Sequence, residues 1–168
     1  MSARQKPPTL EIVPGTVREA LAEGLEDLTV MNWEEVYRDV GDLPLDVDWA
    51  KLLMLERMGQ YKALVARRNG KLVGYNGYFL QPPIRHKTSV WAVNDTIYVD
   101  RAYRASLLGV RLLKAAESAM REAGAKLIFQ GNLWPEATST SGKARARFGA
   151  LLVRLGYEQV ETVYAKRL

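Results

Sequence analysis

Residues 97–113 constrain the fold most strongly, because a β-rich run ends there and an amphipathic helix begins after a basic turn of small residues. The segment reads Ile-Tyr-Val-Asp-Arg-Ala-Tyr-Arg-Ala-Ser-Leu-Leu-Gly-Val-Arg-Leu-Leu. A strand that enters a helix through such a turn presents several free backbone N–H groups and the positive end of the helix dipole at one point. The turn therefore predicts a binding site for a phosphate-bearing ligand.

Strand and helix signals on either side of this segment predict a mixed α/β fold. Asn69 and Gly70 separate two strand-like runs, 61–67 and 72–80, and this pair is favoured in tight β-hairpins. The other expected elements are, in chain order, a strand over 9–13, helices over 17–27, 33–40 and 49–58, a strand over 88–99, a helix over 107–123, a strand over 126–131, a helix over 142–155 and a strand over 157–166. This order predicts the α/β (α+β) class, with a mixed, largely antiparallel central sheet flanked by helices.

Capping signals support two of the early helices. Thr16 and Asn32 stand where N-caps are expected, and each is followed three residues later by an acid, Glu19 and Glu35. A Thr or Asn with a Glu at that spacing is typical of a capping box. The pattern therefore predicts that one helix begins after Thr16 and another after Asn32.

Composition limits the architecture and the chemistry. With 168 residues and 48% hydrophobic content, the chain fits a single domain over 9–168 that follows a flexible arm over 1–8. Cysteine is absent and there is one histidine, so we expect no disulfide, no thiolate chemistry and no metal site. No stretch approaches the roughly 20 apolar residues that span a membrane. We therefore expect a cytoplasmic protein with no membrane partner.

Charge is distributed unevenly along the chain. Residues 1–60 carry 6 Lys and Arg against 12 Asp and Glu, whereas residues 61–168 carry 18 against 7. A basic half suits a ligand with several phosphates, and an acidic half attracts a cationic amine. Charges selected only for solubility give the same pattern, so both interpretations stay open.

The turn after the long strand resembles the acyl-coenzyme A signature of the GNAT superfamily of N-acetyltransferases. In that signature an Arg or Gln is followed three and five residues later by Gly and by Gly or Ala. Arg104 and Gly109 match, and Leu107 replaces the middle glycine. The resemblance covers about two thirds of the chain, from Tyr61 onward, and is greatest to the small acetyltransferases that bacteriophages carry. It implies an acyltransferase that moves an acetyl group from acetyl-CoA to a primary amine.

The resemblance also implies where the cofactor lies. Pantetheine is expected to pair with the backbone of the strand, and the pyrophosphate with N–H groups of the turn, where the Arg104 side chain adds a charge-assisted hydrogen bond. Asn132 is a further candidate for pantetheine binding. The backbone positions implied are Ile97, Tyr98 and Val99 in the strand, and Ala105, Ser106, Leu107, Leu108, Gly109 and Val110 in the turn. Leucine at 107 adds bulk and disfavours a positive φ, which leaves a shifted cofactor or lost activity as alternatives.

Asp95 is the candidate general base. If the long strand alternates regularly, Asp95 shares a face with Trp91, Val93, Ile97 and Val99, and is the one ionisable group on it. Burial there raises the pKa of the carboxyl and makes it a better proton acceptor. Two alternatives remain: a bulge flips the alternation, or the carboxylate only fixes a neighbouring loop.

The expected general acid is absent from its usual place. Family members often carry a Tyr in the last helix that protonates the departing thiolate, and Leu152 occupies that position. Tyr157, Tyr164, Tyr98 or water is left as the proton source, since a thiolate needs little help to leave.

The early helices border the acceptor pocket in this family. Trp33, Glu34 and Tyr37 combine aromatic and acidic groups that suit a cationic or planar substrate. The acceptor itself is left open between a small molecule, a protein and a modified DNA base, and a homodimer is left open as well. The alternative function is a non-catalytic acyl-CoA or nucleic-acid binding module. A basic run in the last helix and its approach fits either phosphate-bearing ligand: Lys143, Arg145, Arg147 and Arg154.

Overall fold

The computed structural model describes residues 9–37, 44–132 and 139–163, with side chains throughout except over 139–146. It divides the chain into two compact units, residues 1–131 and 132–168, which are described separately below. Among the described residues, the first unit holds the sheet and four α-helices, and the second holds one α-helix. The expectation of a single domain over 9–168 stays a prediction.

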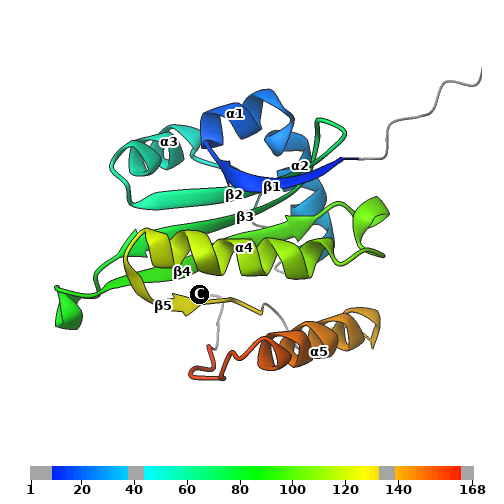
Figure 1. The fold of residues 1–168 in the computed structure, drawn as a ribbon. Helices are drawn as coiled ribbons and strands as arrows, with labels where there is room; N and C mark the ends of the chain where they lie inside the picture. Colours follow the sequence, from blue (N-terminus) through cyan, green and yellow to red (C-terminus); the bar gives the residue numbers. More distant parts are fainter. Residues whose placement is uncertain (1–8, 38–43, 133–138, 164–168) are drawn as a thin grey trace, which may run out of the picture. The chain divides into compact units, whose positions relative to one another are not determined.

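The first unit contains a five-stranded sheet, whose strands lie beside one another in chain order (Figure 1). The first three pairs of neighbours are antiparallel and the last pair is parallel. This confirms the predicted fold class. The strands are β1 (Leu10–Gly15), β2 (Tyr61–Arg68), β3 (Lys71–Gln81), β4 (Val90–Val99) and β5 (Ala125–Phe129).

The β2–β3 hairpin closes where the sequence predicts. Asn69 has φ 52° and Gly70 φ 80°. Positive φ at both central residues is the geometry that matches the twist of the flanking strands, and Asn-Gly adopts it at low cost. Arg68 pairs with Lys71 on either side of the turn.

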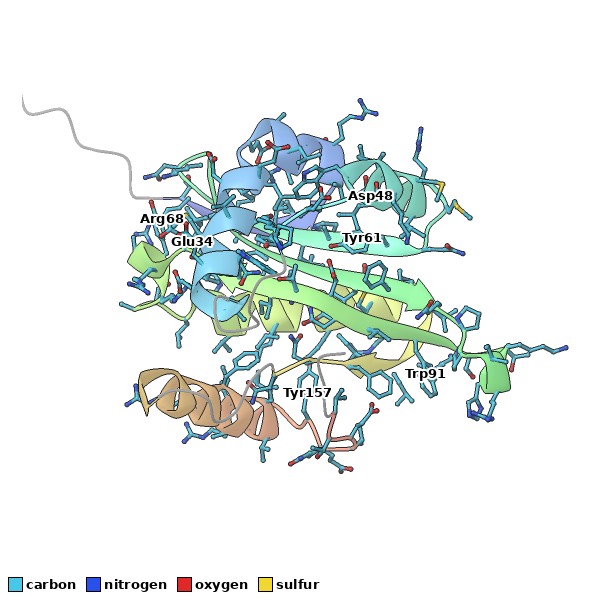
Figure 2. The ribbon with its side chains drawn as sticks, turned by 180° about the vertical axis from the view of Figure 1, so that it is seen from behind. Glu34, Asp48, Tyr61, Arg68, Trp91 and Tyr157 are labelled. Atoms are coloured by element: carbon cyan, nitrogen blue, oxygen red, sulfur yellow. The ribbon has the colours of Figure 1, made fainter. Side chains whose placement is uncertain are left out.

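Helices cover both faces of the sheet (Figures 1 and 2). On one face, α4 (Leu108–Glu122) buries Leu112, Ala116 and Met120 against side chains of β2, β3 and β4. On the other face, α1 (Val17–Ala22), α2 (Leu25–Asn32) and α3 (Trp49–Arg57) pack on a second cluster that includes Tyr61 and Tyr75. The sheet therefore separates two apolar cores.

One of the two predicted capping boxes forms. The Thr16 hydroxyl accepts from the Glu19 N–H at 3.1 Å, and the Thr16 N–H donates back to Glu19 Oε2. Asn32 is not an N-cap, so that prediction is wrong. Gly24, at φ 98°, separates α1 from α2 instead, and α2 continues through Asn32 into a π-helical turn, η1 (Trp33–Tyr37). Residues 38–40 of the expected helix lie outside the described residues.

The second unit contains α5 (Ser139–Arg154) and the segment after it. Gly156 ends the helix at φ 92°, and the Tyr157 N–H returns to the Leu152 carbonyl at 3.0 Å. The expected last strand is wrong over 157–163, where no strand forms, and its remainder lies outside the described residues. A strand needs a neighbour, and the described part of this unit supplies only a helix.

Candidate active site

A β-bulge in β4 places Asp95. Gly77 pairs with Thr96 and Tyr78 with Asn94, so Asp95 is an extra residue without a partner on β3. The bulge resets the alternation of the strand. Ile97 and Val99 pack in the core beside α4, whereas Asp95 and Thr96 line a cavity on the other face. The predicted shared face of Asp95 with Ile97 and Val99 is therefore wrong, because an inserted residue breaks the period of two.

Tyr61 holds the Asp95 carboxylate. Tyr61 lies at the start of β2 (Figure 2), where it is 4% exposed and its ring is edge-on to Phe79. Its hydroxyl donates to Asp95 Oδ2 at 3.0 Å. Gly77 lies directly under the ring. A Cβ at Gly77 would come within 2.8 Å of Tyr61 Cζ and closer still to the hydroxyl oxygen. A glycine at this bulge is therefore what allows Tyr61 to reach Asp95.

The surroundings of Asp95 favour proton uptake. Burial of the carboxylate raises the pKa of Asp95 above its ordinary value, and the hydrogen bond from Tyr61 opposes this. Asp95 is nevertheless exposed at the surface and not enclosed as the sequence predicts, so its burial is partial and protons can enter and leave. Burial and the nearby charge of Asp95 raise the pKa of Tyr61 well above its ordinary value, so its hydroxyl stays a donor. A carboxyl with a raised pKa and access to solvent suits a general base.

The cavity beside Asp95 measures about 220 Å³ and lies between the second face of the sheet and helices α1 to α3. Trp33, one of the residues expected to bind the acceptor, is among the residues that line it. Glu34 is exposed on η1 and Tyr37 is half-buried, and neither lies in the cavity lining. Of the three residues expected to bind the acceptor, the structure brings Trp33 alone to the same cavity as Asp95.

Asn32 fixes one wall of this cavity. It is 5% exposed, and its side-chain amide donates to Thr96 Oγ1 at 2.9 Å and to the Tyr75 hydroxyl at 3.4 Å. These bonds connect α2 to the bulge. The sequence interpretation missed this role, because the partners lie 43 and 64 residues away and a local capping pattern fits Asn32 equally well.

The turn before α4 has the geometry of an anion site. The Ser106 hydroxyl donates to the Tyr103 carbonyl and accepts from the Leu108 N–H. The N–H groups of Gly109 and Val110 belong to the first turn of α4, where backbone N–H groups have no carbonyl partner within the helix. Leu108 is buried and Ala105 is exposed. The structure thus presents backbone donors where the pyrophosphate is expected.

Leu107 does not strain this turn. Its φ is −75°, a conformation that any residue adopts, and its side chain is 73% exposed. Gly109 has no atom within 4 Å of the position that a Cβ would take. Neither glycine of the signature is therefore required here by backbone conformation, which removes the conformational objection to Leu107.

Arg104 is engaged with Glu35. One Arg104 Nη1 lies 2.7 Å from Glu35 Oε2, Nε donates to the Val99 carbonyl at 2.7 Å, and the guanidinium stands over the Tyr98 ring. The Tyr98 hydroxyl donates to Glu35 Oε1 at 2.7 Å. Burial alone would raise the pKa of Glu35, but these bonds outweigh it and lower the pKa. This cluster connects η1 to the end of β4, and Tyr98 is committed to it.

Strands β4 and β5 diverge after Val93 and Phe129, the last pair between them. In the described part of the chain, the β4 edge from Asn94 to Val99 has no strand beside it, and it includes Ile97, Tyr98 and Val99. The Gln130 amide donates to Asn94 Oδ1 at 2.7 Å across the divergence. The free edge lies where pantetheine is predicted to pair.

The second unit holds the remaining candidates. Asn132 is exposed, and its amide nitrogen would lie 3.2 Å from a Cβ added at Gly149. Leu152 is buried, while Arg147 and Arg154 are exposed. The side chains of Lys143 and Arg145, and the whole of Tyr164, lie outside the described residues. The predicted role of Asn132 stays a prediction.

The described residues include no helix that is long and apolar enough to cross a membrane. No three of their His, Asp and Glu side chains come together as metal ligands.

Comparison with known proteins gives one family. Residues 23–134 match the acetyltransferase (GNAT) family. Among solved structures, an aminoglycoside acetyltransferase from an uncultured soil metagenomic sample is similar at 18% identity and a TM-score of 0.68, covering 95% of this chain and 99% of its own. A ribosomal-protein-alanine N-acetyltransferase from Brucella melitensis is similar at 17% identity and a TM-score of 0.64, covering 95% and 100%. An aminoglycoside N-acetyltransferase in complex with CoA is 15% identical at a TM-score of 0.68, covering 100% and 99%. No curated protein matches in sequence.

Proposed function

The chain belongs to the acetyltransferase (GNAT) family, whose donor is acetyl-CoA, and we propose that it transfers the acetyl group directly to a primary amine with Asp95 as general base. One observation carries this proposal. The bulge in β4 presents the Asp95 carboxylate, held by Tyr61, to a cavity on the acceptor side of the sheet. The absence of cysteine fits a cytoplasmic location.

The residues of the turn and of β4 fit acetyl-CoA. When bound, it supplies an acetyl thioester that is activated for attack by an amine. The first-turn N–H groups of α4, including those of Gly109 and Val110, would hold the pyrophosphate. The β4 edge at Ile97 and the N–H of Val99, whose carbonyl already accepts from Arg104, would hold the pantetheine amides. Leu107, at φ −75°, leaves the backbone of this cradle unstrained.

Asp95 accepts the proton that the amine loses, directly or through one water molecule. Only a neutral amine attacks a carbonyl carbon, and a carboxyl with a raised pKa takes up this proton more readily than an ordinary one. The new C–N bond replaces the C–S bond, and the departing sulfur takes a proton from water. We assign water rather than Tyr98, because the Tyr98 hydroxyl already donates to Glu35, and Leu152 at the family's tyrosine position is apolar.

Arg104 has a second function in this account besides charge. Its contacts with Glu35 and the Val99 carbonyl hold the end of β4, the turn and η1 together. An Arg104→Ala variant is therefore expected to weaken acetyl-CoA binding both by removing a cation and by loosening the turn.

The test is thiol release from acetyl-CoA by the full chain with a panel of primary amines, together with calorimetric titration of acetyl-CoA. Asp95→Asn is compared with Asp27→Asn, which changes an exposed acid on α2 in the same way. The proposal requires that Asp95→Asn lower turnover by about 100-fold or more without weakening acetyl-CoA binding, while Asp27→Asn has no effect. Binding of acetyl-CoA without turnover by the unaltered protein would favour the non-catalytic module instead.

A further inference from the structure

The cavity beside Asp95 has apolar walls. At about 220 Å³ it is smaller than the roughly 300–1,000 Å³ of pockets for drug-sized ligands. Its apolar lining comes from three helices, the segment before α3 and strand β2: Val17, Ala20, Leu25, Leu45, Val47, Trp49, Leu52, Ala63 and Val65. An occupant of this space therefore presents a small apolar surface to it.

The polar groups of the lining are already paired with one another. Asn32 donates to Thr96, Thr29 donates to the Leu25 carbonyl at 2.8 Å, and Tyr61 donates to Asp95. Of the lining residues in the described part of the chain, Asp95 alone carries a formal charge. The cavity thus offers one anionic group at the end of an otherwise apolar space.

This chemistry discriminates between kinds of amine. A single ammonium group matches the single carboxylate, and its hydrocarbon body gains from leaving water against valine, leucine and tryptophan side chains. A polyamine or an amino sugar would have to bring further ammonium or hydroxyl groups against those walls without partners, and each unpaired polar group costs binding free energy.

We propose that the acceptor is a small primary monoamine on an aromatic or branched aliphatic body, which lies against the half-buried Trp49 and Leu52 with its nitrogen at Asp95. This inference rests on the proposed function, and it separates the chain from the aminoglycoside acetyltransferases that share its fold.

The experiment compares kcat/KM for four acceptors with the full chain and acetyl-CoA: 2-phenylethylamine, isoamylamine, spermidine and kanamycin. The two apolar monoamines are expected to exceed the other two by about 100-fold, the ratio expected when polar groups are buried without partners. A preference for spermidine or kanamycin would overturn the inference and leave the proposed function intact.

A matched pair of cavity variants makes the test specific. Ala63→Leu narrows the space and Leu52→Ala widens it, and these residues line the cavity from β2 and from α3. The ratio of kcat/KM for 2-(1-naphthyl)ethylamine to that for isoamylamine should fall in Ala63→Leu and rise in Leu52→Ala. A general loss of stability would lower both rates together. Unchanged acetyl-CoA affinity in calorimetry identifies folded variants, and an unchanged ratio in both would contradict the assigned cavity.

A direct binding measurement separates this inference from the proposed function. Titration of 2-phenylethylamine into the protein is followed by the NMR methyl signals of Leu45, Val47 and Leu52, which line the cavity and are half-buried. If no amine is acetylated but these signals shift saturably, the proposed function fails and the assigned occupant of the cavity stands. If amines are acetylated and these signals do not move, the inference fails alone.

Discussion

Two carboxylates of this protein lie in opposite environments along the second half of β4: Asp95 is in the strand itself, and Glu35 of η1 bonds to residues at the end of the strand. Asp95 projects from the bulge, with one tyrosine hydroxyl as partner, and burial raises its pKa. Glu35 accepts from Tyr98 and Arg104, with Arg101 at 3.7 Å, and its pKa is lowered. A carboxylate that lacks a cation is suited to move a proton, and one that is bonded to arginine is suited to hold structure.

Asp95→Asn gives the largest expected effect on activity. The amide keeps a hydrogen-bond acceptor for Tyr61 but no longer takes a proton, and loss of a general base typically lowers kcat by about 10²–10⁴-fold. Steady-state kinetics measure the change. The corresponding amide substitution, Glu35→Gln, should lower kcat far less. Equal losses of kcat in the two variants would remove the distinction between the carboxylates.

Gly77→Ala should disrupt the Asp95 site by displacing Tyr61, the hydrogen-bond partner of Asp95. The new methyl group collides with the Tyr61 ring, and forced overpacking of this kind costs about 1–3 kcal/mol of stability. Urea unfolding and kcat are measured together, and both should fall. Gly131→Ala is the control, because the nearest atom to its added Cβ lies 3.9 Å away, an ordinary van der Waals contact. Unaltered stability and kcat in Gly77→Ala would mean that Tyr61 does not need this approach to Asp95.

Glu35→Gln tests the other carboxylate. Because its pKa in the folded protein is lowered below the ordinary value of 4.5, the charged form contributes stability above that value. At neutral pH the free energy of unfolding of the variant should be lower than that of the unaltered protein by about 1 kcal/mol. This difference should shrink as the pH falls through the folded-state pKa. Urea unfolding across pH measures it, and a difference that persists at low pH would show that charge is not its source.

The contribution of Asp95 to the pH dependence of stability should have the opposite sign to that of Glu35 and a smaller size. A raised pKa means that the folded state favours the protonated acid, so stability is lost as the pH rises above the ordinary value of 3.8 through the folded-state pKa. Asp95→Asn should therefore gain stability at neutral pH. The gain stays below about 1 kcal/mol, because solvent reaches the residue and screens the charge. A loss of stability would indicate a structural carboxylate.

The predictable parts of the molecule are those that local patterns control. The Asn69–Gly70 turn and the Thr16 capping box depend on residues within four positions of each other, and both form as the sequence predicts. The strand, turn and helix around Arg104 also appear in their predicted order. Each of these depends on backbone conformations that a few adjacent side chains favour.

The rest depends on contacts between distant residues. The bulge at Asp95 is an inserted residue, and a period of two gives no sign of it until the pairing with β3 is known. Tyr61 and Asp95 are 34 residues apart, and Glu35 reaches Arg104 from another element. The sequence interpretation assigned Glu35 to a cap because the spacing from Asn32 fits one. Only the fold shows that both residues bond to β4 and the turn after it.

The pH profile of kcat/KM tests the central claim that Asp95 is the base. The unaltered protein should lose activity on the acidic side with an apparent pKa above the ordinary 3.8 of an aspartate. Tyr61→Phe removes the bond that opposes the rise, so this limb should move to higher pH, and in Asp95→Asn it should disappear. A limb that stays at the same pH in both variants would contradict the account.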